Sequence, residues 1–155
     1  MRHGKAEEGH DKADYKRKLI SKGIKRSQKI GQMLKDRKGK IDSILCSNAN
    51  RTVETAEIMA TLFDFPHQEI QKAKELYLCP AGVMMDFFYS LDNTISNVLF
   101  IGHNPGISEL VTSIGDKLID WMPTSSLIAV EINTNNWEEI GNASAKIAFS
   151  LSPKK

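Results

Sequence analysis

The residues with the clearest capacity for chemistry form the run Met1-Arg2-His3-Gly4. An arginine offers a planar fork of donors that matches the oxygens of a phosphate group. A neutral histidine offers a ring nitrogen that is nucleophilic near pH 7, and a glycine lets the backbone approach a ligand closely. The run is typical of a site that binds a phosphoryl group and attacks it, although three residues alone also fit a frayed terminus.

Two further polar residues follow predicted buried strands. His103 comes after the apolar run 97–101 and precedes a predicted helix, and Arg51 follows the predicted strand 41–46 and lies in the first turn of the next helix. Ligands of open α/β sheets bind at the carboxyl ends of the strands, and helix N-termini favour anions there. Alone, Arg51 fits a surface ion pair and His103 a buried loop histidine, but their shared placement indicates an anion site.

The elements that must position these residues alternate between strand and helix. The apolar periodicity and the capping residues predict helices over about 21–38, 49–63, 80–91 and 104–114, and strands over 41–46, 69–72, 97–101, 127–132 and 145–151, with a polar loop over 5–20. This order predicts an α/β fold, a three-layer α/β/α sandwich with a mostly parallel central sheet and an antiparallel pair at its end. We expect one domain over residues 1–155.

Composition narrows the class of protein. Two cysteines, Cys46 and Cys79, are too few for a disulfide framework and indicate a reducing compartment. The sequence shows neither the apolar core of a signal peptide nor the roughly 20 apolar residues of a membrane helix. We therefore expect a cytoplasmic protein that does not act at a membrane, and we expect it to be a monomer.

Charge is unevenly distributed along the chain. Residues 16–40 contain eleven Lys or Arg against the single acid Asp36 and carry +10, whereas the net charge of the whole chain is +2, so the other residues carry −8. Such a segment fits either a solvated helix face or a surface for an acidic partner. Apart from Tyr15, aromatic residues do not alternate with the basic ones, which argues against nucleic acid as the partner.

Three motifs in chain order give the sequence a family resemblance. They are Arg2-His3-Gly4, Ser47-x-x-x-Arg51-Thr52 and Gly102-His103-Asn104-Pro105. Together they resemble the histidine phosphatase superfamily, whose fold is phosphoglycerate mutase-like, and within it the small SixA-type branch of protein-histidine phosphatases. Residues 14–19, the run Glu75-Leu76-Tyr77 and residues 123–126 extend the likeness over nearly the whole chain.

The resemblance implies a role for each matched residue. His3 is the implied nucleophile and forms a phosphohistidine intermediate. The implied phosphate pocket consists of Arg2, Gly4, Arg51, His103 and Asn104. Two guanidiniums and a second histidine would stabilise the charge of the transferred phosphoryl group and lower the pKa of His3. One nitrogen of His3 must donate a hydrogen bond to a fixed acceptor, such as a backbone carbonyl, to set the tautomer.

The proton donor for the leaving group is less clearly marked. Glu75 is similar in placement to the acid that the superfamily usually supplies after its second arginine, although it also fits a surface glutamate. The loop after the nucleophile offers alternative donors, namely Glu7, Glu8, Asp11 and Asp14. Because a phosphohistidine is intrinsically labile, a weak donor would suffice.

Two features depart from the family pattern. The family has a buried strand directly before the Arg-His-Gly motif, where this sequence has Met1, so we expect the first strand to be truncated and hydrogen-bonding edges to be exposed in the core. The interval from Arg51 to His103 is short and leaves no room for a large lid. We therefore expect an open site that suits a bulky protein substrate.

The implied function is a phosphatase that hydrolyses phosphohistidine in a protein, such as a phosphohistidine-containing signalling protein, without a cofactor. Two alternatives share the same residues: a phosphatase of small phosphoesters, and a phosphate-binding or docking module without turnover. A cysteine phosphatase would need Cys-x5-Arg, and Cys46-x4-Arg51 is one residue short. The four histidines, His3, His10, His67 and His103, show no spacing typical of a zinc site, so we expect no metal.

Overall fold

The computed structural model describes residues 1–37 and 39–153. The α-helices are α1 (Ser21–Arg37), α2 (Asn50–Leu62), α3 (Ala81–Tyr89) and α4 (Gly106–Ile114), and the strands are β1 (Ser43–Ser47), β2 (Gln71–Ala73), β3 (Val98–Ile101), β4 (Leu127–Ile132) and β5 (Ala145–Leu151). Short 3-10 helices are η1 (Asp14–Lys16), η2 (His67–Glu69), η3 (Lys74–Leu76) and η4 (Trp137–Glu139). The predicted elements are confirmed with ends shifted by a few residues, and the predicted end of the first helix at Lys38 lies outside the described residues.

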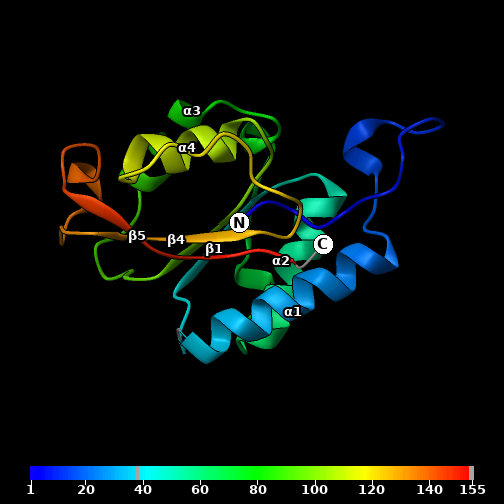
Figure 1. The fold of residues 1–155 in the computed structure, drawn as a ribbon, viewed down its shortest axis with the longest axis horizontal. Coiled ribbons are helices and arrows are strands. Elements are labelled where there is room, and N and C mark those ends of the chain that lie inside the picture. The colour runs from blue at the N-terminus through cyan, green and yellow to red at the C-terminus, as the bar shows by residue number, and fades with distance from the viewer. Residues whose placement is uncertain (38, 154–155) are drawn as a thin grey trace.

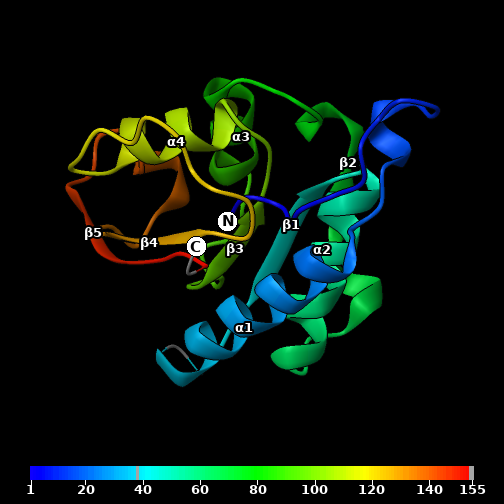
Figure 2. The same cartoon turned by 45° about the vertical axis from the view of Figure 1, so that its right-hand side comes forward.

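The strands form a parallel and an antiparallel part. The parallel part has the order β2-β1-β3, and β4 pairs with β5 in antiparallel fashion. Helices α1 and α2 lie on one side of the strands and α3 and α4 on the other (Figures 1 and 2). The predicted three-layer α/β/α fold with a mostly parallel centre is confirmed.

Successive side chains of β1 point to opposite faces of the sheet, which explains the three layers. Ile44 and Cys46 pack with apolar residues of α1 and α2, whereas Leu45 packs with residues of α3 and α4. All five residues of β1 are buried, as expected for a parallel strand that is covered on both faces. This strand and β3 therefore end at one edge between the two helical layers, and their last residues lead into the candidate site.

Residues 1–3 lie between β3 and the start of β4 and act as a very short strand. The amide of Gly102 donates to the carbonyl of Met1, and the amide of His3 donates to the carbonyl of Gly102. On the other side, the amide of Arg2 donates to the carbonyl of Ser126. His3 is thereby fixed from both sides, so a segment of three residues is enough to hold the proposed nucleophile.

Next to this segment lies a cavity of about 480 Å³. It is lined by Met1 and by residues of both facing strands, among them 98–100 of β3 and 127–132 of β4. The cavity therefore lies between β3 and β4, beside the short N-terminal segment. Among the described residues, no helix combines the length and the apolar character needed to cross a membrane.

Candidate active site

His3 is buried and has a defined tautomer. Its Nδ1 lies 2.7 Å from the carbonyl oxygen of Gly4, and because a carbonyl can only accept, Nδ1 carries the proton. The lone pair is therefore on Nε2, which receives a hydrogen bond from Nε of Arg51 at 3.3 Å. Burial lowers the pKa of His3 to about 4, with further lowering by Arg51 and Arg2. The ring is neutral and able to act as a nucleophile at neutral pH.

Arg51 lies in the first turn of α2 and connects the two histidines. Its side chain is 3% exposed, and its Nη2 donates to Nδ1 of His103 at 3.3 Å. Its guanidinium also donates to the carboxylate of Asp14 at 2.9 Å and to the Asp14 carbonyl at 2.8 Å. The sequence places Arg51 here because it follows β1 within four residues, so the helix start brings the guanidinium to the sheet edge.

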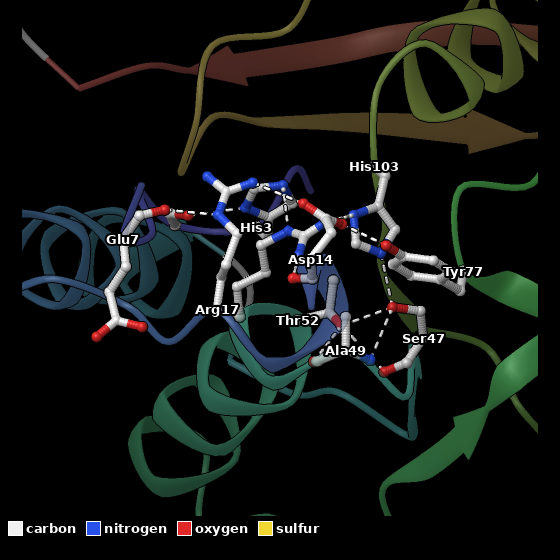
Figure 3. Close-up of polar contacts among 11 residues, drawn as sticks. His3, Glu7, Asp14, Arg17, Ser47, Ala49, Thr52, Tyr77 and His103 are labelled. Atoms are coloured by element: carbon white, nitrogen blue, oxygen red, sulfur yellow. Dashed lines mark hydrogen bonds and ion pairs between the residues drawn. The ribbon is translucent and has the colours of Figure 1, made fainter. Parts of the chain in front are cut away.

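His103 follows β3 and faces His3, with 5.1 Å between the ring centroids. Because Nδ1 accepts from Arg51, the proton lies on Nε2, which donates to the Ser47 hydroxyl at 2.7 Å. The Ser47 hydroxyl contacts that of Thr52 at 2.7 Å. Burial lowers the pKa of His103 to about 3, with further lowering by His3 and Arg51. Figure 3 shows His3, Ser47, Thr52 and His103 around the site.

Arg2 supplies a second guanidinium with an unused donor. Its Nη1 donates to the carbonyl of Met122 at 2.8 Å, and the guanidinium carbon lies 5.3 Å from the centre of the Trp121 ring. Its Nε is buried and has no hydrogen-bond partner among the described residues. Buried donors are seldom left unsatisfied in a folded protein, so this atom indicates a place for an oxygen acceptor of a ligand.

Three residues that sequence reasoning did not place in the pocket, Asp14, Arg17 and Tyr77, form a hydrogen-bonded group beside Arg51. The Asp14 carboxylate accepts hydrogen bonds from Arg51, from Arg17 at 2.7 Å and from the Tyr77 hydroxyl. Partial burial alone would raise the pKa of Asp14, but these bonds hold it well below its usual range. The Tyr77 ring meets the His103 ring edge-on, with 5.4 Å between centroids (Figure 3). The only signal in the sequence was the family-like runs that contain these residues.

The glycine and the asparagine of the predicted pocket have other described contacts. The Gly4 amide donates to the Thr55 hydroxyl at 3.0 Å, and a Cβ on Gly4 would lie 2.8 Å from the Ser27 hydroxyl. The Asn104 side chain donates to the Met122 carbonyl at 2.9 Å and accepts from Ser108. Both residues hold the walls of the site, and their contact with phosphate stays a prediction.

Glu75 lies outside the cluster that forms around His3. It is exposed on η3, and no described hydrogen bond or ion pair joins it to His3, Arg51 or His103. Within the same run, Tyr77 is the residue that reaches the site. Among the alternative donors, Asp14 contacts Arg51 but is held ionised, while Glu7 is bound to Lys12 at 2.7 Å. The assignment of Glu75 as general acid stays a prediction.

Cys46 does not fit the cysteine-phosphatase alternative. It is fully buried on β1, and burial raises the pKa of its thiol to about 12. A nucleophilic cysteine requires a thiolate in an electropositive and accessible place. The thiol of Cys46 is instead a part of the core between the sheet and helices α1 and α2.

Comparison with known proteins agrees with this geometry. A solved structure of phosphohistidine phosphatase SixA from Nakamurella multipartitia superposes with a TM-score of 0.86 and 20% identity over 99% of this chain and 93% of that chain. A structure of the protein histidine phosphatase SixA with tungstate has a TM-score of 0.84 and 24% identity, over 98% of this chain and 94% of that chain. The structure of SixA from Agrobacterium tumefaciens has a TM-score of 0.81 and 23% identity, over 99% of this chain and 95% of that chain. At these identities, the likeness establishes the shared fold.

Comparison of sequences identifies the family. An uncharacterized protein of Mycobacterium tuberculosis is 24% identical over 150 residues, which are 90% of this chain and 91% of that protein. The sequence pattern of the histidine phosphatase superfamily (branch 1) matches residues 1–81, which is more than half of the chain and includes Arg2, His3 and Arg51. The prediction of a phosphatase is confirmed at the level of this family. The chain belongs to branch 1 of the histidine phosphatase superfamily.

Proposed function

We propose that the protein is a phosphohistidine phosphatase that removes the phosphoryl group from a histidine of another protein through an intermediate on His3. The observation that carries this proposal is the hydrogen bond from Nδ1 of His3 to the Gly4 carbonyl. It leaves Nε2 as the one nitrogen of a neutral ring with an available lone pair, which accepts from Arg51 at 3.3 Å and lies where an arginine can also hold a phosphoryl group. An arrangement of this kind is what nucleophilic attack on phosphorus requires.

The reaction has two steps. In the first, Nε2 of His3 forms a bond to phosphorus while the bond from phosphorus to the substrate nitrogen breaks. The substrate imidazole already carries a proton on its other nitrogen, so it takes the electron pair of the broken bond and leaves as a neutral ring. In the second, water attacks the phosphorus of phosphorylated His3, and phosphate and neutral His3 are released. Arg2, with its unused buried Nε, and Arg51 balance the charge of the equatorial oxygens in both steps.

A protein substrate is favoured by the shape of the site and by related proteins. Only 51 residues separate Arg51 and His103, and regular elements use most of them, namely the rest of α2, the strands β2 and β3, helix α3 and two short 3-10 helices. One structure with the same fold carries the name protein histidine phosphatase SixA. We propose the same substrate class for this chain.

Trapping the intermediate tests the proposal. The protein is mixed with a protein phosphorylated on histidine, and the products are analysed by mass spectrometry without acid. We expect phosphate release and a phosphorylated peptide that contains His3, both lost in His3→Ala. Replacing Arg2, Arg51 or His103 by Ala should slow turnover by two or more orders of magnitude, about 3 kcal/mol of barrier each. Phosphate binding without release would instead indicate a docking module, and release from aryl phosphates alone would indicate a phosphoesterase.

A further inference from the structure

The Tyr77 hydroxyl shares a hydrogen-bond acceptor with Arg51. It donates to Oδ2 of Asp14, and the same oxygen accepts from Nη2 of Arg51 at 2.9 Å. The other carboxylate oxygen of Asp14, Oδ1, accepts from Arg17. The position of Oδ2 is therefore one where an oxygen is bound both by Tyr77 and by the guanidinium that contacts His3. A substrate oxygen that replaces Asp14 on Arg51 comes within reach of the Tyr77 hydroxyl.

The contacts around the Tyr77 ring give it a defined place. The ring meets that of His103 edge-on, with 5.4 Å between centroids, and the guanidinium carbon of Arg51 lies 5.9 Å from the ring centre. The preceding residue, Leu76, is fully buried. Figure 3 shows the ring beside His103 with its hydroxyl directed at Asp14. The phenol oxygen is thus held at the same side of the pocket as the second histidine.

The backbone directly after Tyr77 is strained. Leu78 has a φ of 48°, which lies in the left-handed region that residues other than Gly, Asn and Asp seldom adopt. Its side chain is 52% exposed, so packing of that side chain does not explain the conformation. The next residue, Cys79, packs so closely against the start of α4 that a Cβ on Gly106 would lie 2.1 Å from the Cys79 carbonyl oxygen. The strained turn lets Tyr77 face the pocket, and strain of this kind gathers at functional sites.

Among the described side chains that cluster around His3, Tyr77 is the one that can release a proton. The carboxyl of Asp14 is ionised, because its hydrogen bonds hold its pKa well below the usual range. His103 donates its Nε2 proton to Ser47, and the guanidiniums do not deprotonate. Burial and the hydrogen bond to Asp14 raise the pKa of Tyr77, so its hydroxyl holds a proton at neutral pH. A positioned tyrosine is one of the groups that serve as general acids.

We propose that Tyr77 is a catalytic residue that donates its proton to the leaving oxygen when the substrate is a phosphate ester. This proposal rests on the attack by His3 in the proposed function and adds a proton donor. As the bond from phosphorus to the ester oxygen breaks, that oxygen takes the electron pair and the Tyr77 proton, and the alcohol or phenol leaves. The Tyr77 phenolate then takes a proton from the water that attacks phosphorylated His3, which releases phosphate and restores neutral Tyr77.

Aryl phosphates with different leaving groups test the proposal. The p-nitrophenolate ion leaves readily without a proton, whereas the phenolate of phenyl phosphate is a poorer leaving group and depends on one. Tyr77→Phe should lower kcat/KM for phenyl phosphate roughly a hundredfold or more and kcat/KM for p-nitrophenyl phosphate by less than about tenfold. The ratio of the two constants is the measure of proton donation. Tyr15→Phe is the matched control, because Tyr15 is an exposed tyrosine next to Asp14, and it should leave the ratio as it is.

A second comparison separates a proton donor from a residue that only positions Asp14. If Tyr77 acted through Asp14, Tyr77→Phe would have no further effect once Asp14 is replaced by Ala. A proton donor acts on the substrate itself, so Tyr77→Phe should change the ratio in Asp14→Ala as much as in the unmodified protein. Equal ratios in Asp14→Ala with and without Tyr77→Phe overturn the proposal. A changed ratio in Glu75→Gln together with an unchanged one in Tyr77→Phe also overturns it, because Glu75 would then be the donor.

Failure of this proposal is distinct from failure of the proposed function. Phosphorylated His3 trapped together with an unchanged ratio in Tyr77→Phe would keep the nucleophile and remove Tyr77 as the donor. Turnover of free phosphohistidine without turnover of either aryl phosphate would overturn the proposal in the same way, because the site would then lack a working donor to oxygen. If no substrate yields phosphorylated His3, both the proposed function and the role of Tyr77 are wrong.

Discussion

The two histidines of the site hold their protons on opposite nitrogens, and the hydrogen bonds around them explain why. His3 donates from Nδ1 to a carbonyl, which cannot reverse its role. His103 donates from Nε2 to the Ser47 hydroxyl, which can accept or donate. When a phosphate takes over the guanidinium of Arg51, Nδ1 of His103 can become a donor while the ring stays neutral, provided that Ser47 donates to Nε2. The nucleophile is therefore locked, whereas the second histidine can adapt to the ligand.

Replacing Ser47 tests this difference. We expect Ser47→Ala to lower kcat/KM by one to two orders of magnitude, because His103 loses the partner that stabilises its Nδ1–H form. The same change should lower the free energy of unfolding by about 1–3 kcal/mol, because it leaves a buried polar group without a partner. Ser43→Ala is the matched control. Ser43 is buried on the same strand, but its hydroxyl has no partner among the described residues, so its loss should leave activity unchanged. Equal activities of the two variants in steady-state assays would contradict the role of Ser47.

Asp14 competes with phosphate for the guanidinium of Arg51. Its carboxylate occupies Nη2 of Arg51 and Nη1 of Arg17, which are donors that an oxyanion would use. We predict that Asp14→Asn lowers the inhibition constant of inorganic phosphate by about three- to tenfold, because a neutral amide binds guanidinium groups less strongly than a carboxylate does. Asp11→Asn, an exposed change in the same loop, should leave the constant as it is. Weaker phosphate binding by Asp14→Asn would mean that Asp14 positions Arg51 instead.

At the scale of elements, local patterns predicted the strands and helices, but not the contacts that the loops make. The apolar run 98–101 and the glycine after it were enough to place β3 and His103. The run Lys74-Glu75-Leu76-Tyr77 indicated a functional residue, yet a single 3-10 turn over 74–76 decides that Tyr77 reaches the pocket and Glu75 faces solvent. The loop 5–20 folds back through the pair Ala6 and Leu19, a long-range contact that has no periodic signature.

The short strand at residues 1–3 gives an element-scale prediction about stability. The Met1 ammonium is buried and donates to the Phe100 carbonyl at 2.7 Å, and burial lowers its pKa to about 5. An extension of five alternating Val and Ile residues before Met1 would turn this titratable amine into an amide and place apolar side chains in the cavity between β3 and β4. We expect the free energy of unfolding to rise by about 2 kcal/mol or more, measured by urea denaturation.

A polar extension separates the two contributions. Five Gly and Ser residues before Met1 also replace the ammonium by an amide, but they offer no apolar surface to the cavity. This variant should be more stable than the unextended chain and less stable than the apolar one. If both extensions left the midpoint of denaturation where it is, the cavity would not accept a strand.

At the scale of the whole molecule, three buried basic groups lie close together. The ammonium of Met1 and the rings of His3 and His103 come from two strand ends that meet at a single sheet edge, and all three have a lowered pKa, of about 5, 4 and 3. Burial is the first cause in each case. The same concentration of buried groups and guanidiniums that keeps His3 neutral for catalysis thus makes the folded protein resist protonation.

Stability should therefore fall as the pH is lowered from about 8. An unfolded chain takes up protons at the α-amino group of Met1 near pH 8 and at His3 and His103 near pH 6.5, whereas in the folded protein these three groups bind protons only below about pH 5. Since the unfolded state binds more protons in this window, the free energy of unfolding decreases with falling pH, by ~2 kcal/mol or more between pH 8 and 5.5. Urea denaturation at a series of pH values measures the slope. The extended variants should show no pH dependence of stability between pH 8 and 6.5, because they lack the buried amino group. Inorganic phosphate should reduce the slope below pH 6.5, because a bound anion favours protonated His3 and His103. A slope of the opposite sign would show that these groups are protonated in the folded protein, and the neutral nucleophile would then be wrong.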